Sequence, residues 1–243
     1  MSSALVVGGS SGVGRALARA LAQGGSDLVI VAREPRDLEP TAADIALRHG
    51  VRCFAVATDI ADPALDAEAF AERCCALVGE IERVYIPAGG VNDDDVGPNP
   101  ALVAPLVLTN YVGPARLAAA FARRMVERGR GEIVLFSSIA AGAPRTNNVA
   151  YAAAKAALEV YALGLRHFAE PRGVSVTVYA LGYVDTPQSF GRKLLLPIAG
   201  PAQAAAFMVR AARPGKHYYP RFWWWVLLVL KSLPWAIYRR LSF

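Results

Sequence analysis

A tyrosine and a lysine four residues apart form the pattern with the clearest chemistry. Tyr151 and Lys155 stand in the segment YAAAK, inside an alanine-rich stretch that predicts a helix over 149–170, so both side chains share one face. A neighbouring ammonium favours the ionised phenol and lowers the pKa of a tyrosine from its usual value of about 10. Such a phenol can protonate an alkoxide, or take the proton back in the reverse direction.

Two further polar residues could complete such a site. Ser138 follows the apolar segment GEIVLF, which predicts a strand over 132–137, and its hydroxyl can hold a substrate carbonyl. Asn110 falls inside a predicted helix over 101–128, where asparagine is a mediocre helix former. It could hold a water molecule that relays protons to Lys155.

A glycine-rich turn near the N-terminus predicts a dinucleotide site. The segment ALVVGGSSGVGRALARAL indicates a strand, a tight turn and a helix, and glycine allows the backbone to approach a pyrophosphate closely. The amino end of the following helix attracts that phosphate. An ordinary strand–helix turn is the alternative. The candidate contacts are Gly8, Ser10, Ser11, Gly12, Val13 and Gly14.

The end of the second predicted strand favours NADP(H) over NAD(H). An acidic residue there would bond the ribose 2′-hydroxyl, but this chain has Ala32 followed by Arg33, whose guanidinium suits a 2′-phosphate. A plain surface arginine is the alternative. After the third strand, Asp59 and Ile60 could contact the adenine, or Asp59 could cap the next helix.

Together these motifs resemble the short-chain dehydrogenase/reductase family over about residues 3–190. The resemblance implies that Tyr151 is the acid/base, that Lys155 binds the nicotinamide ribose and lowers the Tyr151 pKa, and that Ser138 orients the carbonyl. Asn110 would support a water. The segment VYALGYVDTP looks like the turn that holds the nicotinamide. The implied cofactor contacts beyond those above are Ala88, Gly89, Gly182, Val184 and Thr186.

Three segments depart from the family pattern, at four positions in all. Val7 replaces the usual threonine before the first glycine, and Ile86 and Pro87 replace two asparagines after the fourth strand. Leu181 replaces the proline before Gly182, which could loosen the nicotinamide turn. None of these positions carries the catalytic chemistry, so an active enzyme is expected.

Apolar strands alternate with helices throughout the chain, which predicts an α/β fold with one doubly wound, Rossmann-type parallel sheet covered by helices on both faces. About seven strands are expected, over 4–7, 27–32, 51–57, 83–86, 132–137, 174–180 and 216–219. Helices are expected over 13–24, 36–49, 63–78, 101–128, 149–170 and 201–212. Residues 1–220 form one predicted domain, and 221–243 a separate tail.

Composition indicates a folded cytoplasmic protein with a basic end. Hydrophobic residues make up 54% and charged residues 19% of the 243, which argues against disorder. Neither the three cysteines nor the loop NDDD shows the spacing of a metal site, and no leader precedes the first strand. No acidic residue follows Asp185, whereas nine of the 26 basic residues do; this leaves 17 bases against 20 acids, or −3, before that point.

The tail carries the segment FWWWVLLVL and predicts contact with the cytoplasmic face of a membrane. Nine helical residues at 222–230 cover about 13 Å, against about 30 Å of hydrocarbon, so the run is too short to span. Tryptophan favours the lipid–water boundary and basic residues attract anionic headgroups, whereas nucleic acid would not explain the aliphatic run. The alternative is an arm packed on the core or on a partner subunit.

The tail and the segment GAPRTNNVAY resemble bacterial reductases that act on polyprenylphosphoryl keto-sugars. This resemblance implies a lipid or lipid-linked ketone as substrate and a role in cell-wall synthesis; long-chain keto-lipids would make the same demands. Two alternatives are a reductase of a small soluble carbonyl compound, with the tail as an oligomer contact, and an NADP-binding regulator without turnover. Relatives in the family suggest a homodimer or homotetramer.

Overall fold

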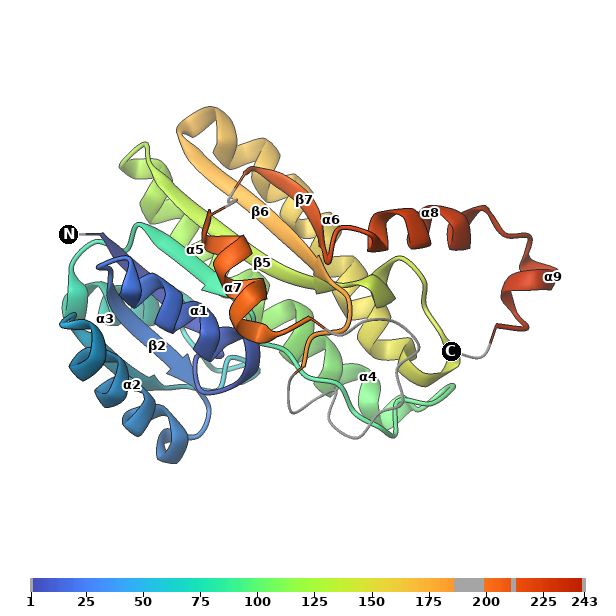
Figure 1. Ribbon diagram of the computed structural model, residues 1–243, viewed down its shortest axis with the longest axis horizontal. Helices are drawn as coiled ribbons and strands as arrows, with labels where there is room; N and C mark the ends of the chain where they lie inside the picture. The colour runs from blue at the N-terminus through green and yellow to red at the C-terminus, as the bar shows by residue number, and fades with distance from the viewer. Residues whose placement is uncertain (1, 186–198, 211–212, 242–243) are drawn as a thin grey trace.

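Seven parallel strands form one sheet, in the order β3-β2-β1-β4-β5-β6-β7, within the residues that the computed structural model describes, namely 2–185, 199–210 and 213–241 (Figure 1). All seven predicted strands are confirmed. Their bounds are β1 Ser3–Val7, β2 Asp27–Ala32, β3 Cys53–Ala57, β4 Arg83–Ile86, β5 Gly131–Ser138, β6 Val174–Leu181 and β7 Gly215–Tyr219.

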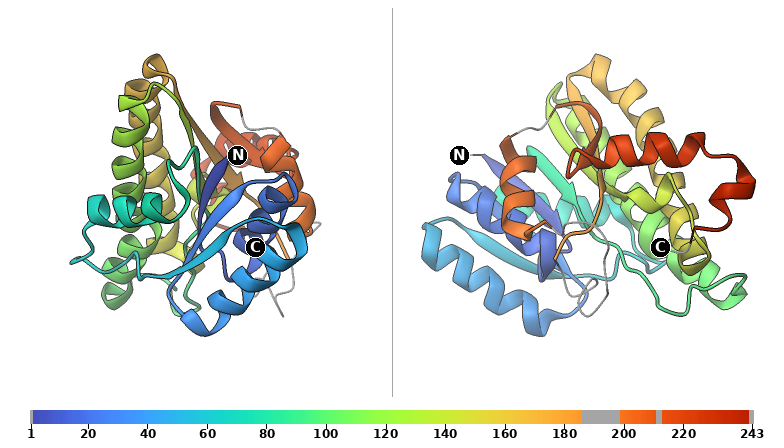
Figure 2. Two further views of the ribbon diagram at one scale, coloured as in Figure 1. Left: turned by 90° about the vertical axis from the view of Figure 1, so that its left-hand side faces the viewer. Right: turned by 45° about the vertical axis from the view of Figure 1, so that its right-hand side comes forward.

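Helices cover both faces of the sheet, as Figure 2 shows in its left view. One layer holds α1 (Gly12–Gln23), α2 (Pro35–His49) and α7 (Pro201–Arg210). The opposite layer holds α3 (Ala67–Val78), α5 (Gly113–Glu127) and α6 (Val149–Ala169). Each layer closes an apolar core on its side of the sheet, and every residue of β1 is buried. Strands covered on both faces need apolar side chains throughout, so the predicted doubly wound fold is confirmed.

The single helix predicted over 101–128 is instead three consecutive pieces. α4 (Pro100–Val107) leads into a π-helical turn at Leu108–Val112, and α5 follows. The turn contains Asn110, whose Nδ2 donates to the Leu106 carbonyl at 3.0 Å. A π turn inserts one extra residue into a helix and often marks a functional site. Helix propensity alone therefore did not predict the π-helical turn around the buried Asn110 side chain.

The helix predicted from residue 63 begins later, at Ala67. Asp66 provides the cap, because its Oδ1 accepts hydrogen bonds from the backbone N–H of Glu68 and Ala69. The carboxylate satisfies two of the donors that a helix start leaves open. Asp59, the alternative cap considered from the sequence, accepts instead from the backbone N–H of Ala61 at 2.9 Å.

The C-terminal segment forms two short helices beside the carboxyl end of the sheet, α8 (Trp223–Ser232) and α9 (Trp235–Tyr238) (Figure 1). One face of α8 packs on the body of the protein, against Ile139, Ala143, Tyr183 and Tyr218. The residues of this inner face are Trp223, Val226, Leu227 and Leu230. The opposite, outer face is exposed and carries Trp224, Trp225, Leu228 and Val229.

The inner face of α8 makes this helix a part of the globular body rather than a detached tail. A side chain at Gly142 would come within 3.3 Å of Leu227, so the loop after β5 and the helix are in close contact. None of the helices in the described part of the chain has the length and apolar character that a membrane crossing requires.

Candidate functional site

A cleft of about 1160 Å³ opens at the carboxyl ends of the strands, where parallel α/β sheets place their ligands. It brings together nearly all of the site residues predicted from the sequence. Those that line it are Gly8, Ser10, Ser11, Gly12, Val13, Gly14, Arg33, Asp59, Ile60, Ala88, Gly89, Ser138, Tyr151, Lys155, Gly182 and Val184. Asn110 lies beneath the surface of the cleft, and Thr186 falls outside the described residues.

Ser138, Tyr151 and Lys155 share one wall of the cleft. Ser138 ends β5 and shares the cleft wall with Tyr151, which stands in the first turn of α6. Lys155 follows one helical turn later, with Nζ 5.9 Å from the centre of the Tyr151 ring. The shared helix face predicted from the spacing of four is therefore present, and it faces the glycine-rich turn across the cleft.

The Lys155 ammonium is buried and held by the backbone. Lys155 as a whole is only 4% exposed, and its Nζ donates a hydrogen bond to the Phe136 carbonyl at 3.0 Å. Gly89 provides the space beside it: a Cβ at that position would lie 2.8 Å from Lys155 Nζ and 2.7 Å from Asn110 Oδ1. Any larger residue at 89 would displace one of the two polar groups.

Burial shifts the pKa values of both Lys155 and Tyr151. Burial lowers the pKa of Lys155 to about 8, because the charged ammonium loses hydration. Burial also raises the pKa of Tyr151 above its usual value, and a hydrogen bond from Ser138 opposes this only in part. The lowered Tyr151 pKa that the sequence suggested is therefore not found in this structure. At neutral pH the phenol carries its proton and can act as an acid.

Asn110 organises backbone rather than lining the cleft. Its Nδ2 donates to the carbonyls of Gly90 and Leu106, at 2.8 and 3.0 Å, and its Oδ1 accepts from the Gly90 N–H at 3.1 Å. Both amide protons are thus used by the backbone, while Oδ1 keeps a second lone pair beside Gly89. The side chain fixes the segment after β4 against the π turn.

The far end of the cleft suits a dinucleotide. The glycine-rich turn joins β1 to the amino end of α1, whose first turn contains no acidic residue that would repel a phosphate. Arg33 lies at the rim with its side chain 71% exposed, 3.6 Å from Glu34. Ile60 is buried and forms an apolar wall next to Asp59.

The opposite end of the cleft is closed by the C-terminal helix. Gly182 follows β6, and a side chain there would collide with the indole of Trp223 on α8. The Trp223 ring also packs edge-on against Tyr183, with the ring centres 5.4 Å apart. Trp223, Val226 and Leu230 all line the cleft. The sequence placed these residues in a separate tail and did not identify them as part of the site.

Asp95 is a further residue that sequence reasoning missed. It is buried at the edge of the cleft, and its two carboxylate oxygens accept the backbone N–H groups of Ala150 and Tyr151 at 3.0 and 2.9 Å. Asn148, the residue immediately before α6, makes no capping hydrogen bond with its own side chain. Asp95 therefore caps α6 from 55 residues away. The sequence offered one sign that a distant cap was needed: the first turn of α6 contains no acidic residue.

Metal and thiol chemistry find no support in this site. Across the described ranges no three His, Cys, Asp or Glu side chains gather as a possible metal site. The thiols of Cys53, Cys74 and Cys75 are free. Burial raises the pKa of Cys53 and of Cys74 to about 12, so both remain protonated and unreactive at neutral pH.

Comparison with curated proteins places the chain among oxidoreductases. A family model described as short chain dehydrogenase matches residues 2–192. The probable oxidoreductase EphD of Mycobacterium tuberculosis is 37% identical over 183 residues, which cover 74% of this chain and 31% of that protein. The chain thus spans less than a third of the length of this relative.

Solved structures share the same fold over most of the chain. A short-chain dehydrogenase from Sphingobium yanoikuyae in complex with NADPH is 26% identical, with a TM-score of 0.81, covering 97% of this chain and 98% of that chain. L-sorbose reductase from Gluconobacter frateurii, complexed with NADPH and L-sorbose, is 25% identical with a TM-score of 0.80. That match covers 89% of this chain and 94% of the reductase.

Substitution of Asp95 by asparagine tests whether this side chain caps α6. Asp95→Asn leaves one acceptor oxygen for two backbone N–H groups, so we expect the free energy of unfolding to fall by about 1–2 kcal/mol. Asp94→Asn is the matched control, because that neighbouring residue is exposed, and it should change stability by less than about 0.5 kcal/mol. Denaturant unfolding gives both values. Equal changes in the two variants would remove the assigned cap.

Proposed function

Because the chain belongs to the short-chain dehydrogenase/reductase family, we propose that it is an NADPH-dependent enzyme that reduces a ketone on a lipid or lipid-linked substrate at a membrane surface. The reverse reaction oxidises the corresponding alcohol. One observation carries the catalytic part of this proposal: Ser138, Tyr151 and Lys155 lie together on one wall of a cleft whose other end is a glycine-rich turn.

The residues of the cleft fit NADPH. The backbone N–H groups of the turn and of the amino end of α1 can donate hydrogen bonds to a pyrophosphate. Arg33 can pair with the 2′-phosphate. The volume of about 1160 Å³ accommodates a dinucleotide together with a substrate. The solved relatives from Sphingobium yanoikuyae and Gluconobacter frateurii were both obtained with NADPH. NADPH supplies the hydride when it is bound.

The chain's own residues provide orientation and a proton. With substrate bound, the Ser138 hydroxyl directs its single proton to the substrate carbonyl instead of to Tyr151, and so aligns the carbonyl beside the phenol. The Tyr151 hydroxyl donates its proton to the oxygen as negative charge develops there. Its raised pKa keeps the proton in place until that moment. The Lys155 ammonium, one turn away, stabilises the phenolate that remains. This arrangement disfavours a role as a binding protein without turnover, since binding does not need Ser138.

Tyr151→Phe tests the chemistry directly. Removal of the hydroxyl removes the proton donor, so we expect carbonyl-dependent NADPH oxidation to fall by at least about a hundredfold. The dissociation constant for NADPH, measured by fluorescence, should stay within about twofold because the ring remains. Tyr161→Phe on the same helix, outside the cleft, is the control and should retain full activity. Turnover preserved in Tyr151→Phe would contradict the mechanism.

Arg33→Asp tests the preference for NADPH over NADH. The variant removes a cation and adds a charge that repels a 2′-phosphate, so we expect the KM for NADPH to rise on the order of a hundredfold. The KM for NADH should change little or improve, because an acidic residue can bond the 2′-hydroxyl. Arg36→Asp makes the same charge change three residues later, outside the cleft, and should affect neither constant. Parallel rises for both cofactors would refute the assignment.

The outer face of α8 supports the membrane part of the proposal. Trp224, Trp225, Leu228 and Val229 form an exposed apolar strip, and Trp235 on α9 is exposed as well. Contiguous apolar surface of this kind marks an interaction site. The exposed basic residues around it, which attract anionic headgroups, are Arg221, Lys231, Arg239 and Arg240.

A second copy of the chain is the alternative partner for this strip, with a small soluble carbonyl compound as substrate. Homodimers and homotetramers do not require α8, however, because α6 exposes apolar side chains of its own at Val160, Leu163 and Phe168. We assign α6 to contacts between subunits and the outer face of α8 to the lipid. A lipid-linked keto-sugar, carried on a polyprenyl phosphate, fits this arrangement.

Trp225→Ser tests the membrane contact without disturbing the cleft. Trp225 is 64% exposed on the outer face, so its loss should weaken binding to vesicles of phosphatidylcholine and phosphatidylglycerol about tenfold in a sedimentation assay. Leu47→Ser changes an apolar residue on α2 that is even more exposed, at 88%; this variant is the control and should bind as the wild type does. A wild-type protein that stays in the supernatant, or a Trp225→Ser variant that changes only the oligomeric mass, would contradict the proposal.

A further inference from the structure

We propose that a notch beside the catalytic residues, between α8 and the loop after β5, binds an anionic group of the substrate, and that Arg145 is the residue that selects it. This inference rests on the proposed function and deepens it, because it assigns a substrate class to particular side chains. The ligand expected in the notch is a phosphate or carboxylate attached to an aliphatic chain.

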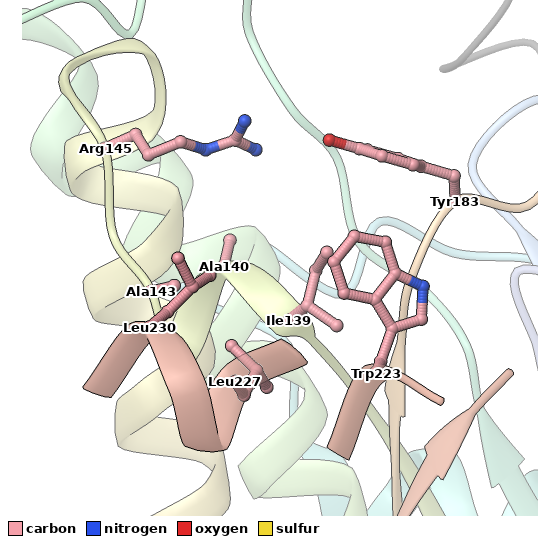
Figure 3. A pocket seen from close by; sticks show the side chains of 8 residues that line it. All are labelled: Ile139, Ala140, Ala143, Arg145, Tyr183, Trp223, Leu227 and Leu230. Carbon is pink, nitrogen blue, oxygen red and sulfur yellow. The ribbon is translucent and has the colours of Figure 1, made fainter. Parts of the chain in front are cut away.

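The notch has an apolar floor and a polar rim (Figure 3). Arg145 and Tyr183 form the rim, and Figure 3 shows the guanidinium and the phenol hydroxyl pointing toward one another across it. A guanidinium presents paired N–H donors that match two oxygens of a phosphate or carboxylate, and the phenol adds a third donor. The floor consists of Ile139, Ala140, Ala143, Trp223, Leu227 and Leu230.

The notch is a side branch of the catalytic cleft. Ile139, Arg145 and Tyr183 line both spaces, as do Trp223 and Leu230 from α8. Ile139 directly follows Ser138, which orients the reacting carbonyl in the proposed mechanism. A group bound at the rim would therefore belong to the same molecule as the carbonyl, a short distance along it.

The surroundings make Arg145 a selective partner for an anion. The side chain is partly buried above an apolar floor, where a charge interaction is screened less than on the open surface. The backbone around it is fixed from two sides: Asn148 Oδ1 accepts the Arg145 N–H at 3.1 Å, and the Tyr238 hydroxyl of α9 donates to the Pro144 carbonyl at 2.6 Å. Because the backbone of this loop is held, Arg145 loses less conformational entropy on binding than an arginine on a mobile loop would.

The apolar floor explains why the anion should carry a chain. Leu227 and Leu230 continue the floor along α8, away from Ser138, and the helix then exposes apolar side chains on its other face. An aliphatic chain leaving the rim would stay in contact with apolar surface along this path. A small anion without a chain would use the rim alone and leave the floor uncovered.

Paired substrates separate the notch from the rest of the site. The probes are a long-chain alkyl phosphate with a carbonyl beside the phosphate-bearing carbon, and the keto-alcohol of the same chain without the phosphate. In wild-type protein the phosphate should have the lower KM. Arg145→Gln should raise the KM for the phosphate by about ten- to a hundredfold, with KM for the keto-alcohol and for NADPH changed less than about twofold. Arg145→Lys should recover part of the loss.

Further variants exclude a general effect of charge or folding. Arg130→Gln removes an exposed charge outside both the notch and the C-terminal segment, and it should leave both substrates unchanged. Tyr183→Phe should raise the KM for the phosphate alone, by less than Arg145→Gln does. Equal losses for both probes in Arg145→Gln, or no loss for the phosphate, would overturn the assignment.

The assays run with and without vesicles that contain phosphatidylglycerol. An effect of Arg145→Gln that appears only with anionic vesicles would mean that Arg145 contacts lipid headgroups rather than substrate, and would also overturn the assignment. If the wild type reduces neither probe while a small soluble ketone is turned over, the lipid part of the proposed function fails. If it prefers the phosphate and Arg145→Gln keeps that preference, only the notch fails.

Discussion

The buried ammonium of Lys155 is the interaction on which the geometry of the cleft depends. A charged group inside the protein needs a fixed polar partner, and the Phe136 carbonyl near the end of β5 provides it. That hydrogen bond sets the position of α6 relative to β5, and so brings Tyr151, one turn earlier, to the end of the same strand beside Ser138. Gly89 then has to remain without a side chain, since a Cβ would press on the ammonium. One buried charge thus constrains two elements and a loop.

The segment after β4 links the remaining parts of the site. At Gly90 it is bound by both ends of the Asn110 amide, from the π turn between α4 and α5. Five residues later Asp95 holds the first N–H groups of α6. A shift of this loop would therefore move both the start of α6 and Gly89, which lies beside Lys155. The side chains of Asn110 and Asp95 thus connect β4, the π turn and α6 through this loop. Neither side chain takes part in the proposed reaction, but both hold the geometry of the residues that do.

The sequence predicted the fold, and the residues that the cleft brings together, because both depend on local patterns. Apolar runs such as DLVIVA indicate covered strands, and a spacing of four places Tyr151 and Lys155 on one face whatever the neighbours are. Asp95 could not be chosen from NDDD, because only the fold brings one of these aspartates to the start of α6. The sequence suggested a lowered pKa for Tyr151, whereas burial raises it. The elements that bury this side chain are distant in the chain, so a local pattern could not reveal the effect. The π turn depends on the partners of a single amide.

The three consecutive tryptophans show why α8 in particular resisted prediction. Nearly every position of this helix is apolar, so no periodicity distinguishes an inner from an outer face. Tertiary contacts make the distinction: Trp223 lies against Gly182 and is 4% exposed, whereas Trp224 and Trp225 face outward. A helix is about 10–12 Å across, so the reaction cleft and the exposed apolar strip are separated by the width of one helix. Whatever partner covers the outer strip also bears on the wall of the cleft. Under the proposed function that partner is the lipid surface, and a substrate anchored in it would need to extend only past α8 to bring its carbonyl to Ser138.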